Sequence, residues 1–211
     1  KIDKEDFELG KEMLKELQDQ MAMMLITKRP HIDPTPFISV LPVSRFPPNE
    51  QQDSTEFVRY MFDMLGAEKQ MLVRNSFAGE LNEAMKCPNC AHETRNPETF
   101  TSMILFVPTE KEAKAQYNPG ELTVQQLLNE KLQVEQMDED NATTCQNCGV
   151  RSAHQKWSEI LSPPAHFCIC LSRLEFDLQT YNLVKKKTKI GIQQSLFVGQ
   201  FTYDIYFVVT H

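Results

Sequence analysis

The feature that most constrains this chain is a pair of C-x-x-C motifs far apart in the sequence. The motifs are Cys-Pro-Asn-Cys at 87–90 and Cys-Gln-Asn-Cys at 145–148. Two residues between cysteines allow a tight turn to direct both sulfurs at one cation, and four thiolates suit tetrahedral Zn²⁺. Residues 91–144 separate the motifs, so tertiary structure must assemble any shared site. The candidate metal ligands are Cys87, Cys90, Cys145 and Cys148.

Two other interpretations of these cysteines stay open at this point. The motifs can be unrelated turns with free thiols, or one of them can be a redox pair. A redox C-x-x-C normally opens a helix that follows a strand, and neither motif has that context. No histidine or carboxylate completes an open coordination position. We therefore expect a closed, structural Zn²⁺ site.

Length, charge and cysteine content restrict the class of protein. A chain of 211 residues predicts one large domain, or one core with an appended subdomain. The six cysteines, with no apolar signal-peptide core near the N-terminus, predict reduced thiols and a cytoplasmic or nuclear protein. A net charge of −7 argues against nucleic-acid binding and weakly favours a basic partner. No apolar run reaches the roughly 18 residues of a membrane-spanning helix, so no membrane partner is expected.

The other two cysteines, Cys168 and Cys170, lie in the apolar run 167–171. Because the run is apolar at every position, it predicts a strand that is buried on both faces. A nucleophilic cysteine needs a nearby base and some exposure. We therefore interpret both residues as core side chains.

Hydrophobic periodicity predicts helices first and strands later, which favours an α+β fold. The first helix should bury Met21, Met24 and Leu25 among its apolar residues. Residues 111–120 are polar and predict a loop, and Thr123 should cap a short helix. The predicted helices cover 5–27, 36–41 and 53–66, and the predicted strands cover 77–86, 99–107, 150–160, 166–176 and 202–210.

Several motifs in a fixed order resemble the ubiquitin-specific protease family of cysteine deubiquitinases. Gln-Gln-Asp-Ser-Thr-Glu-Phe at 51–57 is similar to the family's Q-Q-D-x-x-E-F helix start, and Phe-Ala-Gly-Glu-Leu at 77–81 to its F-x-G-x-L. The C-x-x-C motifs follow. The segments 171–176 and 203–211 resemble the family's L-x-R-F and Y-x-L-x-A-V-V-x-H strands. The resemblance covers nearly the whole chain.

The resemblance implies a cysteine-protease-like hand that binds ubiquitin or ubiquitinated proteins. Residues 1–75 would form part of a helical thumb, 76–160 the zinc-bearing β fingers, and 161–211 the β palm. It also implies that Gln51, Asp53 and Glu56 line the channel for the ubiquitin tail, whose arginines can pair with carboxylates. Asp53 is also the expected N-cap of its helix, and both roles can hold at once.

The family's nucleophilic cysteine box and its catalytic histidine box have no match in this chain. His211 matches the histidine that closes the family's strand, not the catalytic one. The expectation is therefore a hand that is incomplete at both ends, with no catalytic residue among residues 1–211. The parent protein would hydrolyse isopeptide or peptide bonds at the ubiquitin C-terminus by thiol catalysis. The alternative is a catalytically inactive relative that binds ubiquitin or acts as a scaffold.

Overall fold

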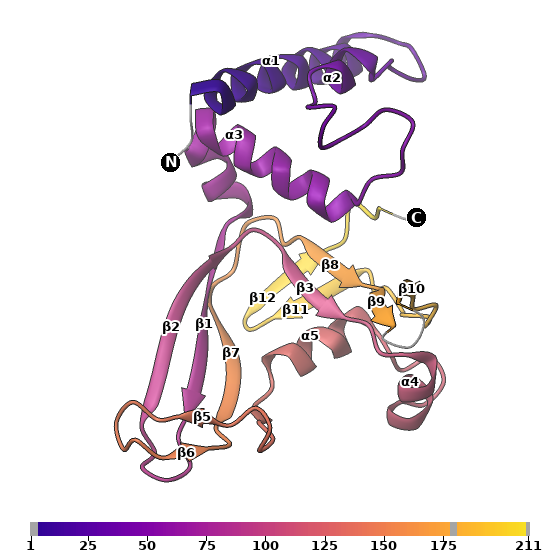
Figure 1. Cartoon of the computed structure of the whole chain (residues 1–211). Helices are drawn as coiled ribbons and strands as arrows, with labels where there is room; N and C mark the ends of the chain where they lie inside the picture. The colour runs from indigo at the N-terminus through magenta and orange to yellow at the C-terminus, as the bar shows by residue number, and fades with distance from the viewer. Residues whose placement is uncertain (1–3, 178–180, 210–211) are drawn as a thin grey trace. The chain divides into compact units, whose positions relative to one another are not determined.

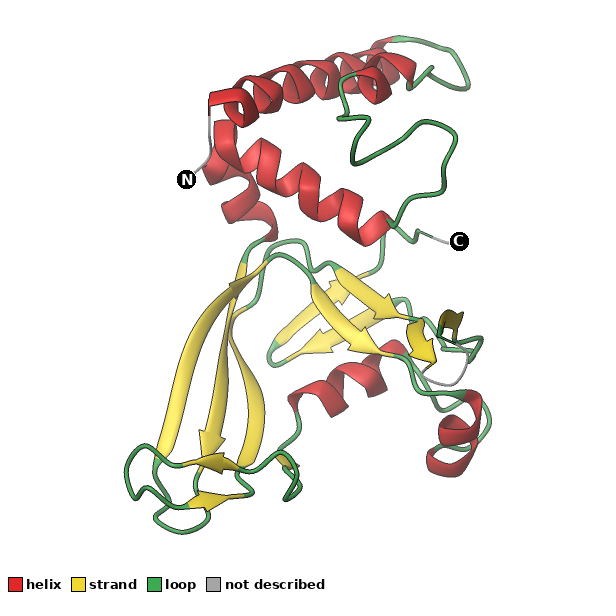
Figure 2. Cartoon of the chain, in the orientation of Figure 1, coloured by secondary structure: helices red, strands yellow, loops and turns green. Residues whose placement is uncertain are grey.

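The computed structural model describes residues 4–177 and 181–209. The chain divides into two compact units, residues 1–76 and 77–211. In the described ranges, the first unit is helical, and the second consists mainly of strands with two short helices (Figures 1 and 2). The mixture of helices and strands agrees with the expected α+β class. In the described ranges, no helix is both long and apolar enough to cross a membrane.

The helical unit contains α1 (Lys4–Ile26), α2 (Thr35–Ser39) and α3 (Ser54–Phe77). Its core forms around Met13 of α1, whose side chain is fully buried. Met13 packs in one cluster with Phe46, Tyr60 and Met64. The Phe46 ring also lies 5.1 Å from the Tyr60 ring, between centroids, so the loop before α3 is fixed to the same core.

The three predicted helices exist, but two details of the prediction are wrong. Met21, Met24 and Leu25, expected in the core, are 55%, 66% and 86% exposed, because α1 meets α3 around Met13, nearer its middle. Helix α3 also continues past Gly66 to Phe77. A glycine in a helix interior costs only about 1 kcal/mol, and strong helix formers follow it here.

The largest element of the second unit is an antiparallel sheet with the order β2-β1-β7-β4. Strand β1 lies inside it and pairs along its length with β2 on one side and with β7 on the other (Figure 1). Short β4 pairs with the start of β7. The bounds are Gly79–Lys86 for β1, Glu93–Phe100 for β2, Glu135–Gln136 for β4 and Gln155–Ser162 for β7.

Among the described residues, the unit also contains four two-stranded sheets. Strands β3 and β8 are parallel, and β5–β6, β9–β10 and β11–β12 are antiparallel hairpins. The bounds are β3 Met103–Phe106, β5 Thr143–Thr144, β6 Arg151–Ser152, β8 Ile169–Ser172, β9 Leu174–Asp177, β10 Asn182–Lys185, β11 Ser195–Val198 and β12 Phe201–Asp204.

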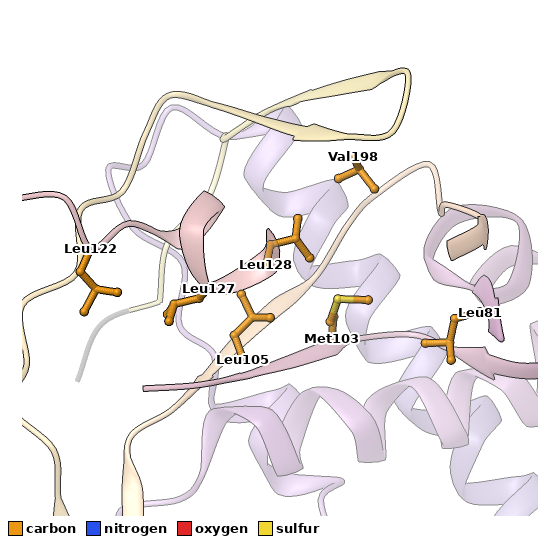
Figure 3. Close-up of a cluster of buried hydrophobic side chains, with 7 residues drawn as sticks. All are labelled: Leu81, Met103, Leu105, Leu122, Leu127, Leu128 and Val198. Carbon is orange, nitrogen blue, oxygen red and sulfur yellow. The ribbon is translucent and has the colours of Figure 1, made fainter. Parts of the chain in front are cut away.

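The core of this unit packs helix α5 (Val124–Leu132) against strands (Figure 3). Leu127 and Leu128 of α5 join Met103 and Leu105 of β3 in one buried cluster. The predicted cap of α5 is confirmed, since the Thr123 hydroxyl accepts a hydrogen bond from the Gln126 N–H at 3.2 Å.

Other predictions for this unit are wrong. Residues 110–116 form helix α4 (Glu110–Gln116) instead of a loop, because Thr109 and Glu112 form a reciprocal capping box. The strand predicted for 99–107 is broken at 101–102, and β12 ends at Asp204. The run 167–171 is half-buried instead of buried on both faces.

Candidate functional site

The first C-x-x-C motif forms the turn between β1 and β2. Cys87 follows β1 directly, and the last ladder pair before the turn joins Lys86 to Glu93. Two backbone hydrogen bonds close the turn: Cys87 N–H donates to the His92 carbonyl, and Ala91 N–H donates to the Cys87 carbonyl, both at 3.0 Å. Ala91 has a φ of 56°, in the left-handed region. We call residues 87–92 the first knuckle.

The second motif forms the turn between β5 and β6 with the same backbone pattern. Cys145 N–H donates to the Val150 carbonyl at 3.0 Å, and Gly149 N–H donates to the Cys145 carbonyl at 2.9 Å. Gly149 has a φ of 70°, at the position that corresponds to Ala91. We call residues 145–150 the second knuckle.

The pairing of β7 with β1 brings the knuckles together despite their separation in sequence. The ladder ends where Gln155 of β7 faces Lys86, the residue before Cys87. His154, the residue before β7, is 5% exposed, and its Nδ1 lies 2.8 Å from the Ser152 carbonyl at the end of β6. The buried link between β6 and β7 therefore places the second knuckle at the same end of the sheet as the first.

The four sulfur atoms lie within 4.8 Å of one another. Across the knuckles, the Cys87 and Cys148 sulfurs are 3.9 Å apart, and those of Cys90 and Cys145 are 3.7 Å apart. A tetrahedral ion with metal–sulfur bonds of about 2.3 Å needs sulfur–sulfur distances of about 3.8 Å. A disulfide needs about 2.05 Å. The arrangement of the thiols therefore fits a tetrahedral metal ion.

The protein environment prepares two of the sulfurs for ionisation. Burial raises the pKa of Cys87, but hydrogen bonds from the backbone N–H groups of Cys90 and Asn89 outweigh burial and lower it to about 6. The Asn147 side chain, and then the His92 backbone, lower the pKa of Cys90. The Asn147 amide nitrogen lies 3.5 Å from the Cys90 sulfur, so one knuckle donates to a sulfur of the other.

Cys148 behaves in the opposite way. A hydrogen bond from the Val150 backbone lowers its pKa, but desolvation and the neighbouring thiols outweigh this and raise it to about 11. Without a cation, four adjacent thiols resist simultaneous ionisation, because like charges oppose one another. A divalent cation among them removes that repulsion and favours four thiolates.

Cys168 and Cys170 do not join this cluster in the described structure. Both are half-buried, and a side-chain hydrogen bond to Cys170, followed by burial, raises the pKa of Cys168. The Cys168 carbonyl accepts a hydrogen bond from Met103 N–H at 2.9 Å, which continues the pairing of β8 with β3. Thiols held in the protonated form are poor nucleophiles.

Gln51, Asp53 and Glu56 are exposed at the start of α3. An Asp53 carboxylate oxygen accepts hydrogen bonds from the N–H groups of Thr55 at 2.7 Å and Glu56 at 3.0 Å, so Asp53 caps the helix. The Glu56 carboxylate lies 3.2 Å from Arg45 Nε. Sequence reasoning missed Arg45, because nothing in the Pro-rich segment before α3 predicts this contact. His211 lies outside the described residues.

This chain is similar to known proteins along most of its length. The family model described as ubiquitin carboxyl-terminal hydrolase matches residues 1–205. Ubiquitin carboxyl-terminal hydrolase 48 of Rattus norvegicus is 26% identical over 208 residues, which cover 92% of this chain and 19% of that protein. Ubiquitin carboxyl-terminal hydrolase 47 of Drosophila melanogaster is 27% identical over 157 residues, which cover 72% of this chain and 10% of that protein.

The chain thus spans about a fifth or less of the length of these relatives. The family match, in contrast, extends over almost all of the chain. It includes the helix start at 51–57 and both knuckles. This chain therefore belongs to the ubiquitin carboxyl-terminal hydrolase family.

Proposed function

We propose that this chain is the ubiquitin-binding body of a ubiquitin-specific protease. The whole protein would hydrolyse isopeptide or peptide bonds at the ubiquitin C-terminus through a cysteine thiolate, with ubiquitin or ubiquitinated proteins as its partners. The family match over residues 1–205 carries this proposal. Because the relatives are named as hydrolases, a catalytic parent is favoured over an inactive scaffold.

Within this proposal the chain forms a hand. Residues 1–75 are part of the thumb, 76–160 the fingers, and 161–211 the palm. The long strands β1, β2 and β7 support this division, since they carry the knuckles at one end. A tetrahedral set of four sulfurs suits Zn²⁺, so we propose a structural zinc ion held by Cys87, Cys90, Cys145 and Cys148. Six cysteines without a disulfide support a cytoplasmic or nuclear location.

The start of α3 would contact the ubiquitin tail. Gln51, Asp53 and Glu56 are exposed there, and a carboxylate forms its strongest hydrogen bonds with arginine. Arg45 already pairs with Glu56, so an arginine of the tail would share or replace that contact. Asp53 keeps one oxygen for the helix cap and has further lone pairs for the tail.

Binding of ubiquitin to Asp53→Asn, measured by isothermal titration calorimetry, tests this role. Asparagine caps a helix as well as aspartate does, so the thermal midpoint should stay unchanged. Loss of a charge-assisted hydrogen bond should weaken binding by about tenfold. Asp33→Asn is the matched control, because Asp33 also accepts from a nearby N–H, that of Thr35 at 2.9 Å. Equal affinities for all three proteins would restrict Asp53 to the capping role.

The catalytic part of the proposal is tested on the full-length protein. A ubiquitin probe with a C-terminal electrophile should form one covalent adduct, visible in the intact mass, because a reactive thiolate attacks it. Absence of an adduct, with ubiquitin binding retained, would favour the non-catalytic scaffold.

A further inference from the structure

The four cysteines of the candidate metal centre differ strongly in exposure. Cys87 and Cys145, the first cysteine of each knuckle, are 1% and 4% exposed. Cys90 is half-buried, whereas Cys148 is exposed. A reagent that approaches from solvent therefore reaches Cys148 before the other three cysteines.

The surroundings of Cys148 explain its exposure. Strands β5 and β6 on either side are two residues long, and every residue from 146 to 150 is exposed. A Cβ built on the next residue, Gly149, would have no heavy atom within 4 Å, so no other part of the described structure packs against that side of Gly149. Around Cys90, in contrast, the Asn147 amide covers the sulfur at 3.5 Å.

We propose that Cys148 is an oxidative modification site, at which peroxide reacts first and thereby opens the metal centre. The proposal rests on the zinc ion proposed above. The reagents that would modify this site are small, water-soluble peroxides. They reach the exposed Cys148 but not the buried Cys87 and Cys145. A modification at this sulfur acts on the second knuckle, whose flanking strands are only two residues long.

The chemistry needs no component beyond the peroxide. The Cys148 sulfur attacks one peroxide oxygen, the O–O bond breaks, and hydroxide leaves; the sulfur loses two electrons and becomes a sulfenic acid. A neighbouring thiolate then attacks that sulfur, an S–S bond forms, the S–O bond breaks, and a second hydroxide leaves. Cys87 stands 3.9 Å away and is one available partner. The centre then retains two thiolates of its original four.

The second pair of cysteines provides an internal comparison. Cys168 and Cys170 are half-buried, and their thiols are hydrogen-bonded to each other. Oxidation follows exposure and thiolate character, and both are lower here than at a metal-bound, exposed sulfur. Peroxide should therefore modify this pair only after Cys148.

The test uses the chain as purified, with its zinc content measured first. Substoichiometric hydrogen peroxide is added, zinc release is followed with a chromogenic chelator, and the free thiols are alkylated before peptide mapping. We expect one zinc ion at the start, zinc release in step with oxidation, and Cys148 in the first sulfenic acid or disulfide. First products without Cys148, such as Cys168–Cys170, would overturn the inference.

A zinc content near zero at the start would instead overturn the proposed metal, so the two failures are distinguishable. Cys148→His sharpens the result, because histidine also binds zinc but is not oxidised in this way. Zinc release from this variant should be slower than from the unsubstituted chain, because its most exposed ligand no longer reacts with peroxide. Cys168→Ser is the matched control and should release zinc at the unchanged rate. Equal release rates from Cys148→His and the unsubstituted chain would contradict the proposal.

Discussion

The two knuckles share a backbone but differ in how the rest of the protein holds them. In each, the fourth residue after the first cysteine donates a backbone hydrogen bond to that cysteine's carbonyl. The same residue, Ala91 or Gly149, has a left-handed backbone conformation. The first knuckle joins two eight-residue strands, β1 and β2. The second joins two two-residue strands, β5 and β6.

This difference indicates which half of the site is ordered before a metal binds. The ladder between β1 and β2 fixes Cys87 and Cys90 without help from a metal, since strand pairing along eight residues is stable within a larger sheet. A two-residue hairpin does not hold its own turn. We therefore expect the second knuckle to depend on the proposed metal for its order, whereas the first knuckle provides a preformed half of the site.

Of the changes considered, metal removal should have the largest effect, and it should affect the two knuckles differently. After chelation, the N–H groups of Cys145 and Gly149 should lose their protection from hydrogen exchange, because the second knuckle opens. Those of Cys87 and Ala91 should keep most of theirs. Hydrogen exchange with and without a zinc chelator measures the difference. Equal loss in both knuckles would show that β1 and β2 give no such support.

Asn147→Ala should have the next largest effect. Its amide donates to the Cys90 sulfur, and loss of such an outer contact typically weakens metal binding by about tenfold or more. Asn89→Ala is the matched control, since the corresponding residue of the first knuckle acts on Cys87 through its backbone N–H. Zinc affinity from competition with a chelator measures both. Equal affinities of the two variants would contradict a specific role for Asn147.

The smallest effects are expected at the left-handed positions, where the knuckles carry different residues. Gly149→Ala should destabilise the chain by about 1 kcal/mol, because its Cβ meets no atom and only the backbone conformation is strained. Ala91→Gly should stabilise it by about 0.5 kcal/mol, since relief of strain exceeds the entropy that glycine loses on folding. Chemical denaturation of the zinc-loaded variants measures the change in the free energy of unfolding for each substitution. A loss of stability in Ala91→Gly would show that Ala91 is not strained.

Local signals in the sequence predicted local structure well. Asp53 and Thr123 cap the helices that they were expected to cap, because a cap depends on residues two or three positions away. The motif Thr109-x-x-Glu112 is an equally local signal, and it starts α4 although the segment is polar. Gly66, a local signal for a helix end, does not end α3, because good helix formers follow it.

Features that depend on distant partners were not predictable in this way. Strand β2 is polar and contains Pro97, so it has no strand pattern of its own; it forms as an edge strand against β1. The spacing identified the four cysteines of the knuckles, but not the pairing of β7 with β1 that brings them together. The contacts of Asn147 with Cys90 and of Arg45 with Glu56 likewise required the fold.

The central claim is that the two knuckles form one metal centre. X-ray absorption at the zinc edge, on chain purified without chelators and with its zinc content measured, tests this most directly. We expect one zinc ion per chain, bound by four sulfurs at about 2.3 Å. A chain without zinc, or a zinc ion with nitrogen or oxygen among its ligands, would contradict it.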